Sequence, residues 1–267
     1  MTATVDPVVR RLVGAPIEVV GQFAQASNAT LLVRLRDRDP RTLDDLSEAL
    51  GRAVTVDDLD VSDLAVHKPA RGERPLWDFP DGTLHRREVA AFEVSEVLGW
   101  DLVPTTVLRD GPYGPGSLQR FVPHDPGDHW FTLVDSDDPS LRDQLRRVVV
   151  FDLVIDNADR KAGHVLLERV DGPAPGRVRL VDHGVSLHVE HKLRTVAWEY
   201  AGQPVAESLR ADVGALAEAV AGPLAGHLAE LLTGEEVDRL VTRAREVAAL
   251  EVFPEPTGPR PYPWPLV

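Results

Sequence analysis

DNADRKAGHVLL, residues Asp156 to Leu167, is polar in its first half and apolar, like a strand, in its second half. A second strand-like run, RVRLVD, follows it and ends on Asp182. The pattern predicts two short strands bordered by polar loops, with Asp159 before the first strand and Asp182 after the second. Carboxylates in such loops can hold Mg²⁺ beside phosphate groups or orient an attacking hydroxyl. These loops are therefore the first candidates for a chemical site.

The sequence before this region is dominated by strand-like runs. Residues 17–36 predict a hairpin around a small polar turn, LAVHKPA (Leu64–Ala70) predicts a single strand, and residues 101–123 predict two strands joined by a Gly/Pro turn. Residues 84–98 have helical periodicity, and Gly99 stands where a left-handed residue often ends a helix. We expect a mostly antiparallel sheet with one main helix.

The second half of the chain has mainly helical patterns. Ser140 with Asp143 three residues later resembles a capping box that opens one helix, and Thr233 with Glu236 resembles another. Apolar spacing predicts helical structure throughout residues 206–250. The proline-rich tail that follows cannot be helical and is expected to be extended over the surface.

The order of these elements predicts an α+β fold with two lobes around a cleft. Residues 1–122 would form an N-terminal lobe, a β-sheet plus a helix, on the phosphate side of a bound nucleotide. Residues 123–267 would form a helical C-terminal lobe that contains the catalytic and metal loops.

The bulk composition excludes several classes of function. The formal net charge of −14, from 29 basic and 43 acidic residues, disfavours a broad binding surface for nucleic acid or anionic lipid. The chain has no cysteine, which excludes disulfides, thiolate zinc sites and a thiol nucleophile. No stretch approaches the roughly 18 apolar residues that a membrane span needs, and the N-terminus lacks an apolar signal core. We expect a cytoplasmic monomer that binds no nucleic acid and does not insert stably into a membrane.

Lysine is almost excluded from this chain, which has only Lys68, Lys161 and Lys192. Lys68 lies in the middle of a predicted strand, where its ammonium can extend toward phosphate groups. Glu88, in the first part of the following helix, can pair with Lys68 and hold it extended, as the equivalent glutamate does in protein kinases. Two later glutamates of that helix compete for this assignment.

The loop around Asp159 and the strand before Asp182 resemble those of a known family. Type II phosphatidylinositol 4-kinases, and more loosely HipA-type and other atypical kinases, share a loop N-x-D-R-x-x-x-N, a strand, and an aspartate in an I-D-N-G element. Asn157, Asp159 and Arg160 match the loop, and Asp182 in VDHG matches the last element. The resemblance implies a two-lobed protein-kinase-like fold in which Asp159 is the catalytic aspartate and Asp182 binds the metal.

The resemblance also covers the sequence upstream of this loop, from about residue 60. KP followed by REVAAFEVSEVLGWDLVPTTVL resembles the lysine strand, helix and next strand of these kinases. SLQRFV resembles their hinge strand, which implies that Gln119, Phe121 and Val122 contact adenine. On this basis the chain is identified as a member of an actinobacterial phosphatidylinositol 3-/4-kinase-like family, and ATP and Mg²⁺ are the implied cofactors.

Two features depart from the family pattern. His164 stands where the loop motif has an asparagine, and a neutral imidazole suits Mn²⁺, iron or zinc better than Mg²⁺. His164 and Asp182 are therefore the candidate metal ligands, with Mn²⁺ as an alternative ion. A glycine-rich G-x-G-x-x-G loop is also absent from the sequence, so contacts to the phosphates would fall to Ser27, Asn28 and Thr30 and their backbone amides.

These patterns predict an ATP-dependent phosphotransferase in which Lys68, Glu88 and Asp159 are the catalytic residues. The phosphoryl acceptor is left open among a protein, a small molecule and an inositol lipid. One alternative is a nucleotide-binding pseudokinase, which His164 favours. Another is a metal-dependent phosphoesterase with a cluster of acids and a histidine, namely Asp152, Asp156, Asp159, Asp182 and His183.

Overall fold

A computed structural model describes residues 6–24, 28–169 and 176–267. The chain forms two compact units. The first consists of Met1–Val89 and Pro104–Phe121, and the second of Ala90–Val103 and Val122–Val267. The division into a nucleotide-phosphate lobe, 1–122, and a catalytic lobe, 123–267, stays a prediction.

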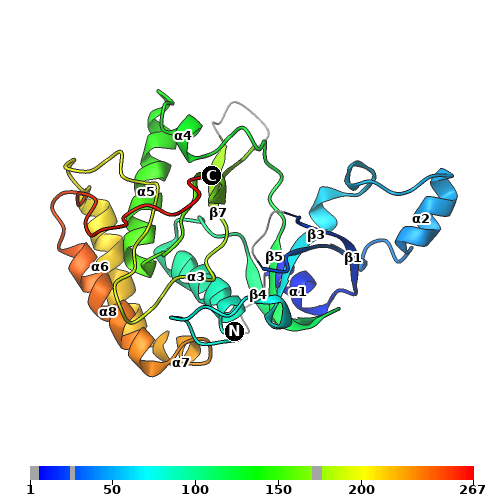
Figure 1. The fold of residues 1–267 in the computed structure, drawn as a ribbon, viewed down its shortest axis with the longest axis horizontal. Helices are drawn as coiled ribbons and strands as arrows, with labels where there is room; N and C mark the ends of the chain where they lie inside the picture. The colour runs from blue at the N-terminus through cyan, green and yellow to red at the C-terminus, as the bar shows by residue number, and fades with distance from the viewer. Residues whose placement is uncertain (1–5, 25–27, 170–175) are drawn as a thin grey trace. The chain divides into compact units, whose positions relative to one another are not determined.

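The first unit contains a five-stranded antiparallel sheet in the order β1-β2-β3-β5-β4 (Figure 1). Both predicted hairpins and the single strand between them are confirmed. Their β-branched and other apolar residues favour strands. The strands are β1 (Ile17–Gln22), β2 (Leu31–Leu35), β3 (Leu64–Pro69), β4 (Thr106–Gly111) and β5 (Gly114–Arg120). The helices are α1 (Pro7–Gly14), α2 (Leu43–Leu50) and the first part of α3 (Leu84–Leu98), and short 3-10 turns are η1 (Val56–Asp58), η2 (Val61–Asp63) and η3 (Ala70–Gly72).

Helix α1 covers part of this sheet and supplies apolar side chains to its core. Leu12 is buried with Val33, Val107 and Leu118 from three different strands. The guanidinium of Arg109, on β4, donates to the carbonyls of Leu12 and Ala15 at 2.7 and 3.0 Å. These bonds satisfy carbonyl groups at the C-terminal end of α1, which would otherwise lack intrahelical partners.

Gly116 on β5 lies in a close contact that leaves no room for a side chain. A Cβ at this position would be 2.4 Å from the carbonyl oxygen of Lys68 and 2.8 Å from the ring of His67. His67 is fully buried, and this burial lowers its pKa to about 4, so the ring is neutral at pH 7. The β3–β5 pairing that positions Lys68 therefore depends on glycine here.

We expect Gly116→Ala to lower the free energy of unfolding by about 1–3 kcal/mol, because the backbone of β3 would have to shift. Urea denaturation measures the change. Gly21→Ala on β1 is the matched control, since a Cβ there meets nothing within 4 Å. Equal stability losses in the two variants would contradict the steric explanation.

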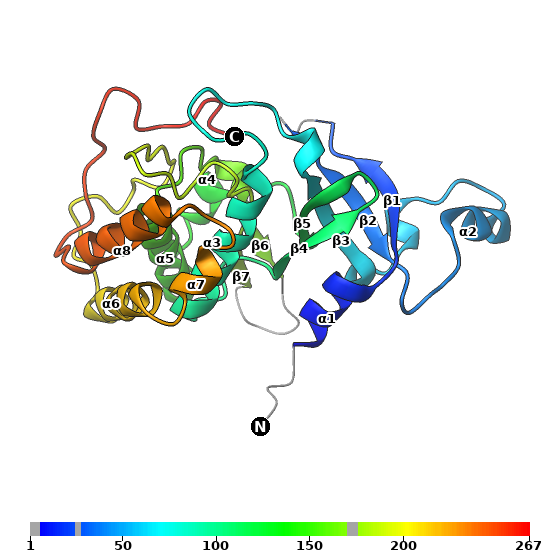
Figure 2. The same ribbon diagram turned by 90° about the horizontal axis from the view of Figure 1, so that it is seen from below.

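The second unit is mainly helical, with a two-stranded antiparallel sheet. Helices α6 and α8 pack along each other, and α8 also contacts α5 (Figure 2). The helices are α4 (Trp130–Leu133), α5 (Pro139–Ile155), α6 (Glu207–Ala221), α7 (Ala225–Leu228) and α8 (Gly234–Ala248). The strands are β6 (Val165–Glu168) and β7 (Arg177–Leu180), and a 3-10 turn, η4 (Ala162–His164), precedes β6.

Helix boundaries show where local patterns were sufficient and where they were not. The capping box of Thr233 and Glu236 is confirmed at the start of α8. The predicted cap at Ser140 is wrong: Asp138 caps α5, and its carboxylate accepts the amide of Ser140 at 2.8 Å. The predicted helical run 206–250 is interrupted around Gly222 and again before Thr233.

The tail from Pro254 to Val267 contains no helix or strand, as predicted.

No helix in the described part of the chain is long and apolar enough to cross a membrane.

Candidate functional site

In the first unit, Lys68 and Glu88 form an ion pair. Lys68 projects from β3, and its Nζ donates to Oε1 of Glu88 on α3. The Glu88 side chain is only 3% exposed, whereas that of Lys68 is 20% exposed. The structure therefore brings together the two residues that the sequence analysis paired, and it leaves the lysine partly open to solvent.

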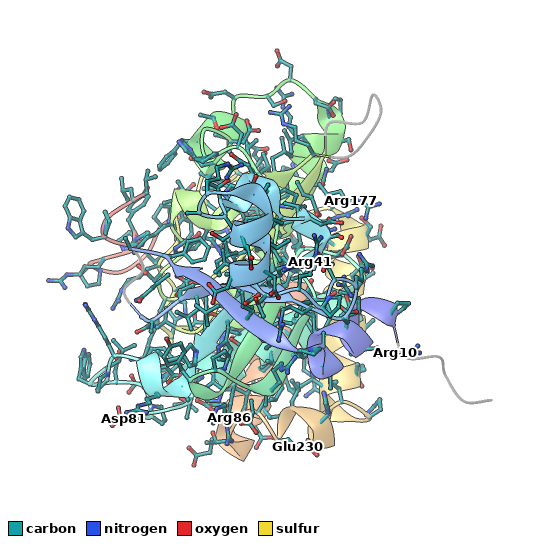
Figure 3. All side chains as sticks on the ribbon, turned by 90° about the vertical axis from the view of Figure 1, so that its right-hand side faces the viewer. Arg10, Arg41, Asp81, Arg86, Arg177 and Glu230 are labelled. Carbon is teal, nitrogen blue, oxygen red and sulfur yellow. The ribbon has the colours of Figure 1, made fainter. Side chains whose placement is uncertain are left out.

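The start of α3 is anchored by a residue that no local pattern identified. The carboxylate of Glu73 accepts the amides of Leu84 and His85, at 3.1 and 2.8 Å, and contacts the His85 ring at 2.7 Å. Burial by itself would raise the pKa of Glu73, but hydrogen bonds from the ring and amide of His85 and from the amide of Leu84 keep it below its ordinary value. Arg86, labelled in Figure 3, is exposed, whereas its neighbour Arg87 is buried with its guanidinium 5.0 Å from the ring of Phe79. These contacts fix the turn of α3 from which Glu88 projects.

Of the residues predicted to bind the phosphates and adenine, Asn28 and Gln119 already bind other groups of the protein. Ser27 lies outside the described residues. Asn28 accepts the amide of Arg74 through Oδ1 at 2.8 Å. Gln119 is buried, and its amide donates to Thr106 Oγ1 at 2.9 Å, so this side chain already has a partner within the sheet.

Main-chain groups of the predicted hinge also have partners. The amide of Phe121 donates to the carbonyl of Leu64 at 3.2 Å, and the carbonyl of Val122 contacts the ring of His124 at 2.8 Å. The adenine contacts of Gln119, Phe121 and Val122 stay a prediction.

In the second unit, Asp159 lies in the loop between α5 and β6. Its amide donates to Asn157 Oδ1 at 2.9 Å, which closes the turn, and its Oδ2 is 3.3 Å from Lys161 Nζ. Burial raises the pKa of Asp159 above the ordinary value, while the Lys161 ammonium opposes this shift and Asp182 adds to it. The side chain keeps 34% exposure. A partly buried carboxylate beside an ammonium is suited to exchange a proton with a bound hydroxyl group.

Asp182 and His164, the two predicted metal ligands, lie together. Nε2 of His164 is 3.3 Å from Oδ2 of Asp182, and the Asp182 side chain is 50% exposed. The predicted strand that ends on Asp182 is too long: β7 ends at Leu180, and Asp182 follows it with a left-handed backbone, φ 62°. His164 ends the 3-10 turn η4, where Nδ1 faces the amide of Lys161 at 3.4 Å.

This pair fits a divalent ion that takes its other ligands from phosphate and water. Within the described ranges, there is no group of three or more His, Cys, Asp or Glu side chains that could hold a metal. Mg²⁺ in nucleotide sites is usually held by one or two carboxylates together with substrate phosphates. A carboxylate and an imidazole can therefore be sufficient for a phosphate-bound ion, although the imidazole shifts the preference toward Mn²⁺.

A buried arginine links the Asp159 loop to the Asp182 loop. Nε of Arg160 donates to Asp152 at 3.0 and 3.2 Å, and Nη1 donates to the carbonyl of Val181 at 2.8 Å. Thr195 Oγ1 donates to the same Asp152 carboxylate at 2.9 Å. Arg160 follows Asp159 directly, and its side chain binds Val181, the residue just before Asp182. One side chain therefore holds the two loops next to each other.

The acids proposed for a phosphoesterase cluster serve other contacts. Asp152 is fully buried against Arg160, and Asp156 accepts the amide of Lys192 at 2.7 Å and lies 2.7 Å from Nδ1 of His191. His183 is buried edge-on to the ring of Phe151 at 5.8 Å. The described residues therefore do not form the acid-histidine cluster of that alternative.

Lys161 was not assigned a role from the sequence, yet it lies beside Asp159. Its rarity was the available signal, since the chain has only three lysines. Asp152 was named only in the phosphoesterase alternative, although it lies eight residues before Arg160, its partner in the structure. Thr195 had no such signal, because its hydroxyl reaches Asp152 from 43 residues further along the chain.

Comparisons with known proteins show what the sequence and the fold of this chain resemble. No family model matches the chain. It is 44% identical over 236 residues to Protein Rv2133c of Mycobacterium tuberculosis, across 75% of this chain and 81% of that protein. Among solved structures it resembles the proinflammatory kinase CtkA of Helicobacter pylori, with a TM-score of 0.50, 10% identity, and coverage of 91% of this chain and 94% of that one. The chain thus has a two-lobed, kinase-like α+β fold.

Proposed function

We propose that this chain, which belongs to the same family as the mycobacterial protein Rv2133c, is an ATP-dependent phosphotransferase of the phosphatidylinositol 3-/4-kinase-like type. The observation that carries the proposal is the linkage of Asp159 and Asp182 through Arg160, with Lys161 at 3.3 Å from Asp159. Two aspartates in these positions, one partly buried with a raised pKa and one exposed, match the separate needs of hydroxyl activation and metal binding.

Each residue would act on a defined atom. Lys68, held by Glu88, would bind the nucleotide phosphates through its ammonium. Asp159 would orient the acceptor hydroxyl and take its proton as the oxygen attacks the γ-phosphorus, while ADP leaves with the electrons of the broken P–O bond. Lys161, 3.3 Å from Asp159, would balance charge near that carboxylate. Asp182 and His164 would hold a divalent ion, which neutralises charge on the phosphate oxygens.

The proposal is tested by phosphoryl transfer from labelled ATP. Lysate proteins, small alcohols and phosphatidylinositol vesicles are offered as acceptors, with Mg²⁺ or Mn²⁺ present, and adenylyl transfer is scored in parallel. We expect transfer to one acceptor class by the wild type and its loss in Asp159→Ala. Metal-dependent ATP binding without transfer would indicate the pseudokinase alternative, and equal transfer in both proteins would contradict the assignment of Asp159.

The metal preference should depend on His164. We expect His164→Asn to raise the ratio of Mg²⁺-supported to Mn²⁺-supported activity by about tenfold, because an amide oxygen suits Mg²⁺ better than an imidazole nitrogen does. Metal titrations at fixed ATP measure the ratio. His227→Asn, a surface histidine paired with Glu93, is the matched control. An unchanged ratio in His164→Asn would remove His164 from the metal site.

A further inference from the structure

The end of the chain binds the loop that contains the candidate catalytic aspartate. The carbonyl of Leu266 accepts the amide of Ala162 at 2.8 Å. Ala162 is the first residue of η4, the turn that ends at His164 and follows directly on Lys161. This hydrogen bond therefore ties the η4 turn, which lies between Asp159 and His164, to a segment about a hundred residues further along the chain.

A second contact of the tail reaches the segment that supports Arg160. The carbonyl of Pro261 accepts the amide of Thr195 at 3.1 Å and the indole Nε1 of Trp198 at 3.3 Å. Thr195 forms a parallel bridge with Arg160 and also donates its hydroxyl to Asp152. Thr195 is thus bound on one side by Arg160, which follows Asp159, and on the other by Pro261 of the tail.

The tail makes these contacts mainly with its backbone. Pro263 is buried, but the neighbouring Trp264 is 87% exposed, and Tyr262 and Val267 are also exposed. The carbonyls of Pro261 and Leu266 accept hydrogen bonds, whereas most large side chains of the tail are exposed, so the tail adds little to the apolar core. Its contribution is to the geometry of the residues whose amides it accepts.

We propose that residues 261–267 are a positioning element of the phosphotransfer site. By binding the amides of Ala162 and Thr195, they hold η4 and the chain around Thr195, so that Asp159 and His164 keep their positions. The inference rests on the proposed function for its catalytic consequence. Its structural part, fixation of Ala162 and Thr195 by the tail, can be measured without turnover.

The test is a variant that ends at Arg260. We expect the amides of Ala162 and Thr195 to exchange hydrogen about tenfold faster or more, because their acceptors are gone. The Mn²⁺ concentration for half-maximal ATP-dependent thermal stabilisation should rise, and kcat should fall about 10- to 100-fold, as expected for a small displacement of catalytic groups. A synthetic peptide of residues 258–267 should restore part of kcat, which it would not do for a misfolded protein.

Two further variants make the result specific. Deletion of residues 265–267 removes the Leu266 carbonyl and keeps that of Pro261, so exchange should increase at Ala162 and not at Thr195. This smaller deletion also serves if the longer one fails to fold. Trp264→Ala keeps the tail backbone and removes a side chain that is 87% exposed, so the amides of Ala162 and Thr195 should exchange at the wild-type rate.

Unchanged exchange at Ala162 and Thr195 after truncation would overturn the proposal. A rise of kcat would overturn it as well, since the tail would then inhibit the site. A wild type that transfers phosphate to no acceptor would end the proposed function alone, because the exchange and Mn²⁺ measurements would still decide whether the tail positions the loop.

Discussion

Asp159→Asn is expected to lower kcat about 10²- to 10⁴-fold, the usual contribution of a positioned general base. The amide keeps the size of the side chain and its place next to Lys161, but it cannot take a proton from the acceptor hydroxyl. KM for ATP should change little, because Asp159 is assigned to the acceptor. Steady-state kinetics with the acceptor identified in the transfer screen measure both constants.

The wild-type pH profile gives an independent check of the same residue. Burial raises the pKa of Asp159 above 3.8, so its ionised form is lost at a higher pH than for an ordinary aspartate. Activity should therefore fall on the acidic side with an apparent pKa above this value, and the acidic limb should disappear from the residual activity of Asp159→Asn. Asp143→Asn, an exposed position on α5, is the matched control and should keep the wild-type profile.

Stability should move in the opposite direction from activity. Since the pKa of Asp159 is raised in the folded state, the folded protein binds more protons than the unfolded chain between pH 3.8 and the raised pKa. The contribution of Asp159 to the free energy of unfolding therefore decreases as pH rises through this window. At pH 7 we expect Asp159→Asn to have an equal or higher Tm than the wild type, and a large loss of Tm would show that Asp159 is a structural residue.

Local sequence patterns were sufficient for elements whose own side chains determine them. The strands β1, β2 and β3 and the helix α3 follow from periodicity, and the cap of α8 follows from Thr233 and Glu236. The cap of α5 was misplaced because Ser140 and Asp138 are both good capping residues, and the pattern alone favoured the wrong one. The proline at position 139 fits the first turn of a helix that begins after Asp138.

The candidate site was predictable only in part. Asp159, Asp182 and His164 belong to two loops that a motif identifies, and the structure places Asp182 beside His164. One supporting contact, that of Leu266 with Ala162, joins positions about a hundred residues apart in sequence. No local signal encodes such a pair, because backbone acceptors can serve any residue type.

Lys68→Met is expected to weaken ATP binding by roughly 10- to 150-fold, which corresponds to the loss of a hydrogen bond to a charged group worth about 1.5–3 kcal/mol. The same change removes the ammonium that pairs with a carboxylate of 3% exposure. Breaking a buried pair in this way costs about 3–5 kcal/mol, and the partial exposure of Lys68 favours the lower end. Isothermal titration calorimetry and urea denaturation measure the two effects.

A second substitution separates binding from stability. In Lys68→Met/Glu88→Leu both charges are replaced by apolar groups, which often restores the stability of a buried ion pair. We expect most of the free energy of unfolding to return while ATP affinity stays low, since no cation remains to bind the phosphates. Arg86→Met, an exposed charge change on the same helix, controls for net charge and should leave both quantities near wild type. Recovery of ATP affinity in the double variant would mean that Lys68 holds Glu88 in place and does not itself contact the nucleotide.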